Sequence, residues 1–329
     1  MPLFPSNMPA YFMSQLQNRM APAKIIWQIC DHKRGHENQS SGLIHALSKQ
    51  TAIEPIRIDI DKHKASWWQA VRGIFPPASA LPQPDLIIAT GSQTHSSLLA
   101  AGRATGAPTL LIMAPPKGLT RFFDLCIVPA HDQRQGPNII QTTGAMNTVE
   151  ASPNKEPQAG LFLIGGPSQH HNWDEAALLE QISTILAANT DLRWQLTTSR
   201  RSPSHTTKQL QQLQQVQARA SDQLEVIPVE DTAADWLPRQ LARSSYVWVT
   251  EDSVSMVYEA LSSGAKVGLL PVPRKAGESR IVRGLDALQQ SQHVLSYSKE
   301  HTDLTHFKAP PPLNEAARIA KIVVAKFLT

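Results

Sequence analysis

The sequence predicts an α/β protein built from two consecutive, doubly wound parallel-sheet domains, and three observations support this prediction. The chain has 329 residues, which is too long for one ordinary hydrophobic core. From Lys24 onward, short apolar runs alternate with amphipathic segments, as in buried parallel strands joined by helical crossovers. The alternation pauses at the polar stretch Glu150–Gln158, which we interpret as an interdomain linker, and then restarts.

In the first half, short apolar runs bounded by turn residues predict six strands. They are Lys24–Cys30, Pro55–Ile60, Asp85–Thr90, Thr109–Met113, Leu125–Val128 and Ile139–Gln141. Amphipathic spacing predicts helices between them at Asn38–Lys49, Ser66–Ile74 and Ser92–Thr105.

The second half repeats the pattern. Its predicted strands are Gly160–Ile164, Trp194–Thr198, Leu224–Pro228, Tyr246–Thr250, Val267–Leu270 and Val294–Ser296. Its predicted helices are Asp174–Ala188, Thr206–Ser221, Thr232–Arg243, Val254–Ser263, Arg280–Gln290 and Asn314–Leu328.

These elements divide the chain into an N-terminal extension (1–23), a first domain (24–150), a second domain (151–313) and a C-terminal helix (314–329) that we expect to cross back to the first domain. Ligands of doubly wound sheets bind beyond the carboxyl ends of the strands. We therefore expect the two domains to face each other across a cleft lined by the residues that follow their strands.

Composition excludes several classes of protein. No apolar run approaches the ~18 residues of a membrane span. Only Cys30 and Cys126 are present, which excludes a disulfide scaffold and a cysteine-built zinc site and indicates a reducing compartment, the cytoplasm. Residues 1–23 lack the features of an export signal, and Met20 is an alternative start. The net charge of +4 is dispersed, unlike the basic stripe of a nucleic-acid-binding protein, and suits an anionic small molecule.

Ionisable residues follow the first predicted strand. Asp31 or His36 is a candidate general base for a substrate hydroxyl, although a charged surface loop capped by Asn38 remains an alternative. The third strand ends in Gly91 and Ser92, where the glycine would allow a ligand to approach the backbone and the serine would cap the next helix.

Two loops of the second half resemble anion sites. Gly165, Gly166 and Ser168 open this half and present backbone N–H groups, but they form neither a Walker loop nor a dinucleotide fingerprint. Ser199, Arg200 and Arg201 follow the next strand, and paired arginines suit phosphate recognition. A tight turn and a solvated loop are the structural alternatives. His170 and His171 lack a nearby carboxylate pair, so we expect polar loop residues and no metal.

The segment from Thr250 to Gly264 gives the sharpest prediction. Helical spacing places Val254, Val257, Tyr258 and Leu261 on one face, and Asp252, Ser255, Met256 and Glu259 on the other. A diphosphate fits the positive helix N-terminus near Ser253, and Glu259 would accept hydrogen bonds from a ribose.

Aromatic and basic residues mix between Lys62 and Phe75, including Trp67, Trp68 and Arg72. Two interpretations stay open: a peripheral helix that contacts an anionic membrane, or tryptophans that pack against the sheet.

Several of these motifs together resemble GT-B glycosyltransferases, including the peptidoglycan N-acetylglucosaminyltransferases. They resemble more closely the elongated-mitochondria fission-factor family, whose bacterial members are classed as glycosyltransferases. The resemblance covers residues 24–295 and rests on five motifs in order: Gly35-His36-Glu37-Asn38-Gln39, Gly136-Pro137-Asn138, Gly165-Gly166-Pro167-Ser168 with Trp173-Asp174, Thr198-Ser199-Arg200-Arg201-Ser202-Pro203, and Asp252-Ser253-Val254-Ser255-Met256 with Glu259-Ala260.

The resemblance implies a GT-B fold and a nucleoside-diphosphate sugar as co-substrate, without a cofactor or metal. The motifs then divide into catalytic residues (Asp31, His36), acceptor-binding residues (Gly35, Glu37, Asn38, Gln39, Gly91, Ser92) and donor-binding residues (Gly165, Gly166, Ser168, Ser199, Arg200, Arg201, Asp252, Ser253, Ser255, Met256, Glu259). The acceptor is expected to be a cell-envelope saccharide or a lipid-linked molecule, reached in the cytoplasm or at the inner face of its membrane. Two alternatives remain, because fold does not fix function: a sugar-nucleotide epimerase and a non-catalytic scaffold that recruits other proteins.

Overall fold

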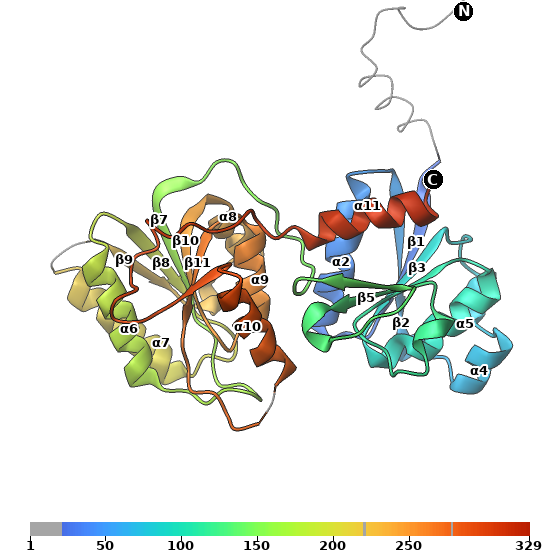
Figure 1. Ribbon diagram of the computed structural model, residues 1–329, viewed down its shortest axis with the longest axis horizontal. Helices are drawn as coiled ribbons and strands as arrows, with labels where there is room; N and C mark the ends of the chain where they lie inside the picture. Colours follow the sequence, from blue (N-terminus) through green and yellow to red (C-terminus); the bar gives the residue numbers. More distant parts are fainter. Residues whose placement is uncertain (1–21, 220–221, 278) are drawn as a thin grey trace, which may run out of the picture. The chain divides into compact units, whose positions relative to one another are not determined.

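The computed structural model describes residues 22–219, 222–277 and 279–329. The chain forms two compact units, one containing residues up to Thr148 together with Glu315–Thr329, the other Val149–Asn314. Of the predicted N-terminal extension, all but the last two residues lie outside the described part. Each unit holds one six-stranded, fully parallel sheet with helices (Figure 1), so the α/β, doubly wound fold class is confirmed.

The first unit contains sheet A, with strand order β2-β1-β3-β4-β5-β6. Its strands are β1 (Lys24–Cys30), β2 (Ile53–Asp59), β3 (Leu86–Thr90), β4 (Thr109–Ile112), β5 (Leu125–Pro129) and β6 (Ile139–Thr142). Its helices are α2 (Arg34–Ser48), α3 (Ile60–His63), α4 (Trp67–Arg72), α5 (His95–Thr105) and α11 (Glu315–Phe327), with short 3-10 turns at Pro76–Ser79, Ser92–Thr94, Thr120–Phe122 and Ala130–Asp132.

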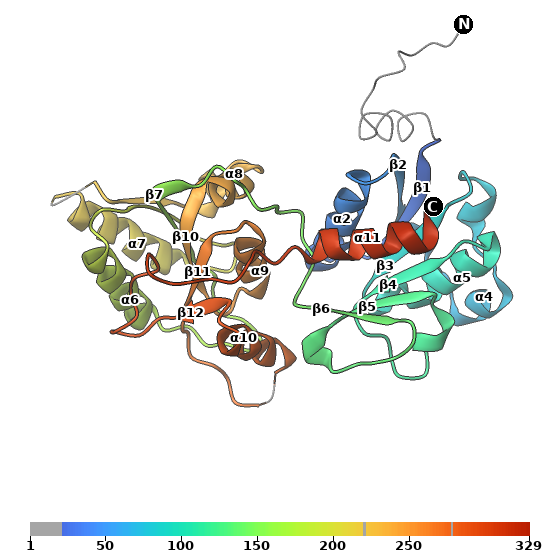
Figure 2. The same cartoon turned by 45° about the horizontal axis from the view of Figure 1, so that its top comes forward.

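Two apolar clusters cover the faces of sheet A. Helices α4 and α5 pack on one face, and α2 and α11 pack together on the other (Figure 2). The last helix therefore belongs to the first unit although it follows the second in sequence. Its buried residues are Ala316, Ile319, Ala320 and Val323.

The second unit contains sheet B, with strand order β12-β11-β10-β7-β8-β9. Its strands are β7 (Glu156–Leu163), β8 (Arg193–Thr197), β9 (Leu224–Ile227), β10 (Ser244–Thr250), β11 (Lys266–Leu270) and β12 (Val294–Ser296). Its helices are α6 (Glu175–Ala188), α7 (Ser204–Gln217), α8 (Trp236–Arg243), α9 (Val254–Ser262) and α10 (Arg280–Gln290), with a 3-10 turn at Val229–Asp231.

The observed bounds correct three expectations. Helix α2 begins at Arg34, so Gly35–Gln39 lie in its first turns and not in a loop before it. Strand β7 begins at Glu156, which pairs with Ser244 of β10, so the last three residues of the predicted linker belong to a strand. Helix α5 begins at His95 with Thr94 at its N-cap, so Ser92 does not cap it.

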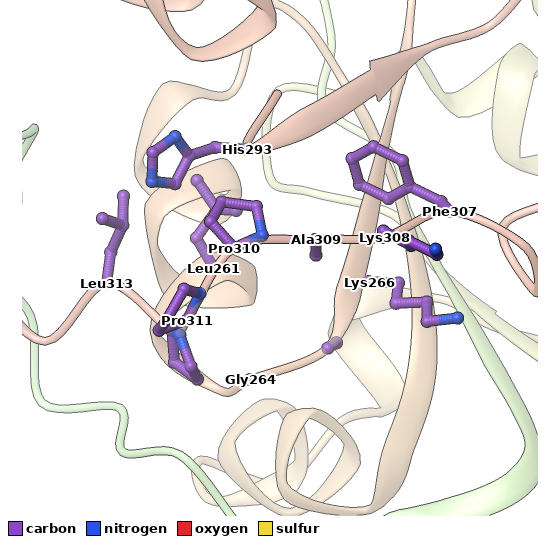
Figure 3. A pocket seen from close by; sticks show the side chains of 12 residues that line it. Leu261, Gly264, Lys266, His293, Phe307, Lys308, Ala309, Pro310, Pro311 and Leu313 are labelled. Atoms are coloured by element: carbon purple, nitrogen blue, oxygen red, sulfur yellow. The ribbon is translucent and has the colours of Figure 1, made fainter. Parts of the chain in front are cut away.

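A cavity of about 380 Å³ opens at the amino end of β11, where Leu261, Lys266, His293 and Phe307 surround a proline-rich turn (Figure 3). This edge is opposite to the carboxyl ends of the strands, where α/β sheets bind ligands. The cavity is therefore not the predicted donor site. None of the helices in the described part of the chain combines the length and hydrophobicity that a membrane span requires.

Candidate functional site

The first cluster of polar residues lies at the carboxyl edge of sheet A. Asp31 follows β1 directly, His36 lies in the first turn of α2, and Gly91 follows β3, the strand that pairs with β1. Because the carboxyl ends of neighbouring parallel strands share one edge, these residues meet although 60 positions separate Asp31 from Gly91.

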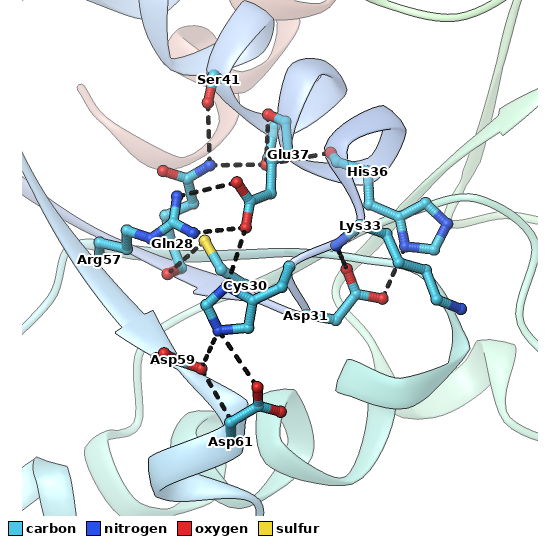
Figure 4. A network of polar contacts seen from close by, with 12 residues as sticks. Gln28, Cys30, Asp31, Lys33, His36, Glu37, Ser41, Arg57, Asp59 and Asp61 are labelled. Atoms are coloured by element: carbon cyan, nitrogen blue, oxygen red, sulfur yellow. Dashed lines mark hydrogen bonds and ion pairs between the residues drawn. The ribbon is translucent and has the colours of Figure 1, made fainter. Parts of the chain in front are cut away.

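Asp31 and His36 form a dyad. His36 Nδ1 lies 2.8 Å from Asp31 Oδ2, and Asp31 Oδ1 accepts a hydrogen bond from the Lys33 backbone N–H at 3.2 Å (Figure 4). The Asp31 side chain is fully buried, whereas that of His36 is 19% exposed. When Nδ1 donates to the carboxylate, the lone pair lies on Nε2, which can then accept a proton. An oriented imidazole of this kind is suited to general-base chemistry.

Gly91 is required by the position of the imidazole. Its φ of +87° favours glycine, and a Cβ there would lie 2.3 Å from His36 Cε1 and 2.4 Å from Nδ1. The ring therefore packs directly against the backbone of the β3 loop. Beside it, the buried Thr90 hydroxyl has no hydrogen-bond partner among the described residues.

A Gly91→Ala substitution is expected to displace the His36 ring and reduce any activity that depends on it. The matched control is Gly106→Ala, because Gly106 also has a positive φ (+73°) but has open space where a Cβ would stand. Backbone strain is expected in both variants, about 1–2 kcal/mol at the left-handed Gly106 and more at Gly91, whose φ of +87° and ψ of 165° are almost restricted to glycine. Thermal unfolding should show a loss of stability in both variants that is larger in Gly91→Ala, and activity assays should show a loss of activity in Gly91→Ala alone. Equal activity in the two variants would argue against the packing role of Gly91.

The remaining predicted acceptor residues have different environments. Glu37 forms a bidentate ion pair with Arg57 of β2, so its carboxylate is used within the fold. The Gln39 amide donates to the Gly35 carbonyl at 3.4 Å, and Gly35 itself is exposed and open. Asn38 is half-buried, and Ser92 is exposed. Their predicted roles in acceptor binding stay predictions.

His32 was not among the predicted site residues. It has a φ of +58°, and its Nε2 lies 2.6 Å from Asp59 Oδ1 and 3.5 Å from Asp61 Oδ2. The hydrogen bond that the His32 ring donates to the Asp59 carboxylate raises the pKa of His32. In the described part of the chain, one group of three histidine, cysteine or acidic side chains is close enough to share a metal ion. It consists of His32, Asp59 and Asp61. They are already ion-paired and partly exposed, and these contacts account for their positions.

The two cysteines are unsuited to catalysis. Cys30 and Cys126 are buried and free, and burial raises the pKa of the Cys30 thiol to about 11 and that of Cys126 to about 12. Because the thiolate is the reactive form, neither side chain is a candidate nucleophile at neutral pH.

The second cluster lies at the carboxyl edge of sheet B, where the loops after β7, β8 and β10 are tied together. The Gly165 N–H donates to Thr250 Oγ1 at 2.8 Å, and the Gly166 N–H donates to Asp252 Oδ2 at 3.0 Å. The Ser202 hydroxyl donates to the carbonyls of Ile164 and Gly165. Since β7 lies between β8 and β10, the topology brings these three loops together.

In the loop after β7, Gly165 and Gly166 stand at positions where any larger residue would clash. A Cβ at Gly165 would lie 2.2 Å from Asp252 Oδ2, and one at Gly166 would lie 2.2 Å from the Arg201 carbonyl oxygen. The loop therefore needs glycine so that its neighbours can approach its backbone.

The two arginines after β8 differ. Arg201 donates to Asp252 Oδ2 at 2.7 Å, to the Gly166 carbonyl at 3.0 Å and to the Pro167 carbonyl at 3.3 Å. Arg200 is exposed and makes no side-chain hydrogen bond or ion pair with any described residue. Arg201 therefore holds the three loops together, and phosphate binding by Arg200 and Arg201 stays a prediction.

Helix α9 leaves the same edge. Val257, Tyr258 and Leu261 are buried, while Ser255 is exposed and Glu259 is half-buried. Met256 is half-buried as well, and Ser253 stands at the N-cap without a side-chain capping bond. The helix N-terminus therefore keeps first-turn amides that no capping side chain occupies, as an anion site requires.

Asp252 corrects the predicted helix face. It was expected beside Ser255 and Glu259, but its side chain is fully buried and paired with Arg201. Its Oδ1 has no hydrogen-bond partner among the described residues. Two serines predicted to bind the donor stabilise turns in their own loops. Ser168 Oγ accepts a hydrogen bond from the His171 backbone N–H at 3.1 Å, and Ser199 Oγ accepts one from the Arg201 backbone N–H at 3.2 Å.

Sequence reasoning missed a buried ion pair in the same region. Glu251 is 3% exposed and accepts hydrogen bonds from Nε and Nη2 of Arg274, both at 3.1 Å. Arg274 Nη1 donates a third hydrogen bond to Asp286. His171 is 1% exposed, and its Nε2 is buried without a described partner. Burial lowers the pKa of His171, which favours the neutral imidazole. No local motif signals these contacts, since Arg274 follows Glu251 by 23 residues.

Comparisons with known proteins agree with the two-unit architecture. The family model described as mitochondrial fission ELM1 matches residues 34–327. No curated protein matches the chain. The UDP-GlcNAc 2-epimerase of Methanocaldococcus jannaschii is similar, with 11% identity, a TM-score of 0.56, and 92% of this chain and 100% of that chain covered.

Two further solved structures show the same fold. The UDP-GlcNAc 2-epimerase of Neisseria meningitidis, solved with UDP-GlcNAc, has 13% identity, a TM-score of 0.51, and 93% and 99% coverage. A glycosyltransferase of Rickettsia africae has 12% identity, a TM-score of 0.50, and 93% and 95% coverage. Two consecutive α/β units, each with a parallel sheet, are the fold class of GT-B proteins.

Proposed function

Because the chain belongs to the mitochondrial fission ELM1 family and has a GT-B fold, we propose that it is a glycosyltransferase that uses a nucleoside-diphosphate sugar. One observation carries this proposal: the loops after β7, β8 and β10 are bonded into a single platform at the N-terminus of α9. Such a platform offers amide donors and a cation to an anion at the edge where α/β sheets bind ligands.

In this proposal the second unit binds the donor. The first-turn amides of α9, near Ser253 and Ser255, and the Arg200 guanidinium hold the diphosphate. Gly165, Gly166 and Ser168 form the adjoining wall of the donor site. The Arg201–Asp252 pair fixes the position of this wall. Glu259 accepts hydrogen bonds from the ribose, since it stands roughly 9 Å along the helix axis from Ser253. Met256, half-buried on the same helix, offers apolar contact to the nucleoside.

The first unit supplies the base. His36 Nε2 accepts the proton of the acceptor hydroxyl, whose oxygen forms a bond to the anomeric carbon while the bond from that carbon to the diphosphate breaks. The electron pair leaves with the diphosphate, where the α9 amides and Arg200 stabilise the negative charge without a metal ion. Asp31 acts as a positioning residue that sets the tautomer of His36 and stabilises its protonated form.

The acceptor is a cell-envelope saccharide or a lipid-linked molecule, such as an intermediate of lipopolysaccharide synthesis. A lipid-linked acceptor would place the reaction in the cytoplasm at the inner face of the cytoplasmic membrane.

Donor binding is the direct test. Isothermal titration calorimetry with UDP-, GDP-, ADP- and CMP-sugars should reveal binding of at least one donor. Arg200→Ala should raise the Kd about tenfold to a hundredfold, because a hydrogen bond to a charged group contributes about 1.5–3 kcal/mol. Glu259→Ala should weaken binding of the sugar nucleotide in the same direction.

Arg193→Ala is the matched control for Arg200→Ala, because Arg193 is an exposed arginine at the amino end of the same strand, β8. It should leave the Kd unchanged. Absence of heat with every donor, or equal affinity of wild type and Arg200→Ala, would contradict the donor site.

A sugar-nucleotide epimerase is the second candidate, since two of the similar solved structures are UDP-GlcNAc 2-epimerases. An epimerase needs no acceptor. Incubation with the bound donor alone, followed by NMR of the sugar, separates the two reactions: an isomeric sugar nucleotide identifies an epimerase, and an unchanged donor excludes one.

A recruitment scaffold of the fission-factor type is the third alternative and makes no use of the dyad. In cells that depend on the protein, Asp31→Ala and His36→Ala variants would then remain fully functional. Loss of function in variants that still fold would support catalysis.

A further inference from the structure

Helix α4 shows the reverse of the usual burial pattern. Its buried residue is Ala70, which packs in the core shared with α5, whereas Trp67 is 50% and Trp68 58% exposed. Val71 is 71% exposed, and Ile74, just after the helix, is 39% exposed. A surface helix normally turns its large apolar side chains inward. This helix, which lies beside α5 in Figures 1 and 2, presents them to solvent.

These four side chains, which we call the tryptophan patch, form one surface. Trp67 and Trp68 lie four and three residues before Val71, so these three side chains share one side of α4, and Ile74 follows the C-cap residue Gly73. The expectation that the tryptophans pack against the sheet is therefore wrong. Of the aromatic residues in this segment, Phe75 is the one in the core: it is 4% exposed, and its ring centre lies 6.2 Å from that of Trp27.

Cations flank the tryptophan patch. Lys62 and Lys64 precede it and are exposed, and the Arg72 guanidinium lies 4.5 Å from the centre of the Trp68 ring. Asp61 is the one carboxylate between residues 60 and 75. Tryptophan prefers the boundary between water and hydrocarbon, and lysine and arginine beside it are attracted to anionic headgroups.

The segment that leads into the tryptophan patch starts at the edge of the candidate base. Ala65 exchanges hydrogen bonds with the hydroxyls of Ser96 and Ser97 at the start of α5, the helix that follows the Gly91 loop. On the other side, His32, next to Asp31, contacts Asp59 and Asp61 at the start of α3. The segment from Lys62 to Trp68 thus begins at the carboxyl edge of sheet A, where the His36–Asp31 dyad lies.

We infer that the tryptophan patch, with Lys62, Lys64 and Arg72, docks the protein on an anionic lipid bilayer. A bilayer suits this surface because exposed indoles insert between lipid headgroups, and the flanking lysines and Arg72 complement the negative charge of those headgroups. Docking here brings the edge that holds His36 close to the headgroups. This last step rests on the proposed function and favours a lipid-linked acceptor over a soluble saccharide.

The test is co-sedimentation of the full chain with vesicles of phosphatidylglycerol and phosphatidylethanolamine, and with phosphatidylcholine vesicles. Wild type should pellet with the anionic vesicles, less so as salt is raised, and remain in solution with phosphatidylcholine. The double variant Trp67→Ala/Trp68→Ala should reduce the bound fraction at least tenfold, as should Lys62→Glu/Lys64→Glu. Each variant should keep the wild-type unfolding temperature, because these side chains are exposed.

Matched controls lie on the second unit. Val216 on α7 is 60% exposed, and Lys208 and Lys308 are exposed lysines, so Val216→Ala and Lys208→Glu/Lys308→Glu should sediment like wild type. The inference is overturned if wild type stays in solution with anionic vesicles, or if the patch variants pellet as wild type does.

A second copy of the chain is the alternative partner of the tryptophan patch. Should wild type form a dimer that Trp67→Ala/Trp68→Ala dissociates, and bind no vesicles, the surface is an interface between copies and the inference fails. Because sedimentation needs neither donor nor acceptor, membrane docking can fail while donor binding holds, and the reverse.

Discussion

Replacement of His36 by alanine is expected to lower the rate of sugar transfer by about 10²- to 10⁴-fold, the usual contribution of a positioned general base. The reason is that Nε2 of His36 carries the lone pair, oriented through the 2.8 Å contact of Nδ1 with the buried Asp31 carboxylate. The kcat should fall while the donor Kd, measured by calorimetry, stays at the wild-type value.

Two variants make this result interpretable. His45→Ala removes an exposed histidine from the last turn of the same helix, α2, and should retain wild-type kcat. Asp31→Asn keeps the shape of the partner but changes the hydrogen bond that orients the ring, so kcat should fall there too, without a change in donor affinity. Wild-type kcat in His36→Ala would remove His36 from the mechanism.

Replacement of Arg201 by methionine is expected to lower the free energy of unfolding by roughly 3 kcal/mol, because it leaves the fully buried Asp252 carboxylate without its cation. It also removes the hydrogen bonds to the Gly166 and Pro167 carbonyls, which join the β8 loop to the β7 loop. Urea unfolding followed by circular dichroism measures the change.

Arg243→Met provides the comparison. Arg243 and Glu156 form an ion pair at 2.8 Å with both side chains about half exposed, and such pairs contribute at most about 1 kcal/mol. The double variant Arg201→Met/Asp252→Asn should regain part of the lost stability, since the buried charge is gone and the Gly166 N–H still has an oxygen to bind. Equal losses in Arg201→Met and Arg243→Met would show that the Asp252 pair behaves as a surface pair.

Sequence periodicity predicted most elements of the fold within a few residues. β12 and α10 have the predicted bounds, and β1 and the α9 start agree as well. These elements were predictable because a buried parallel strand is a continuous apolar run and a surface helix has a 3.6-residue apolar period. The start of α2 was not, because Arg34 to Gln39 are polar and no side chain caps the helix.

The candidate site was predictable only in part. Loops after strands could be recognised as the place where ligands bind, which directed attention to His36, Gly91, Arg200 and the start of α9. The different roles of adjacent residues could not be predicted. Arg200 and Arg201 are identical, exposed residues in adjacent positions, and only the fold shows that Arg201 is bonded to Asp252.

The sequence by itself determined the order of strands and helices, the two α/β units and the polar residues that follow their strands, because local apolar periodicity and turn chemistry encode these features. Tertiary structure alone decided which of those residues meet. The Asp31–His36 dyad against Gly91, the Glu251–Arg274 pair and the exposure of Trp67 and Trp68 depend on which strands are neighbours and which helix face finds a partner. The packing of Gly91 against His36 and the Glu251–Arg274 pair join residues distant in sequence, and no local pattern specifies them.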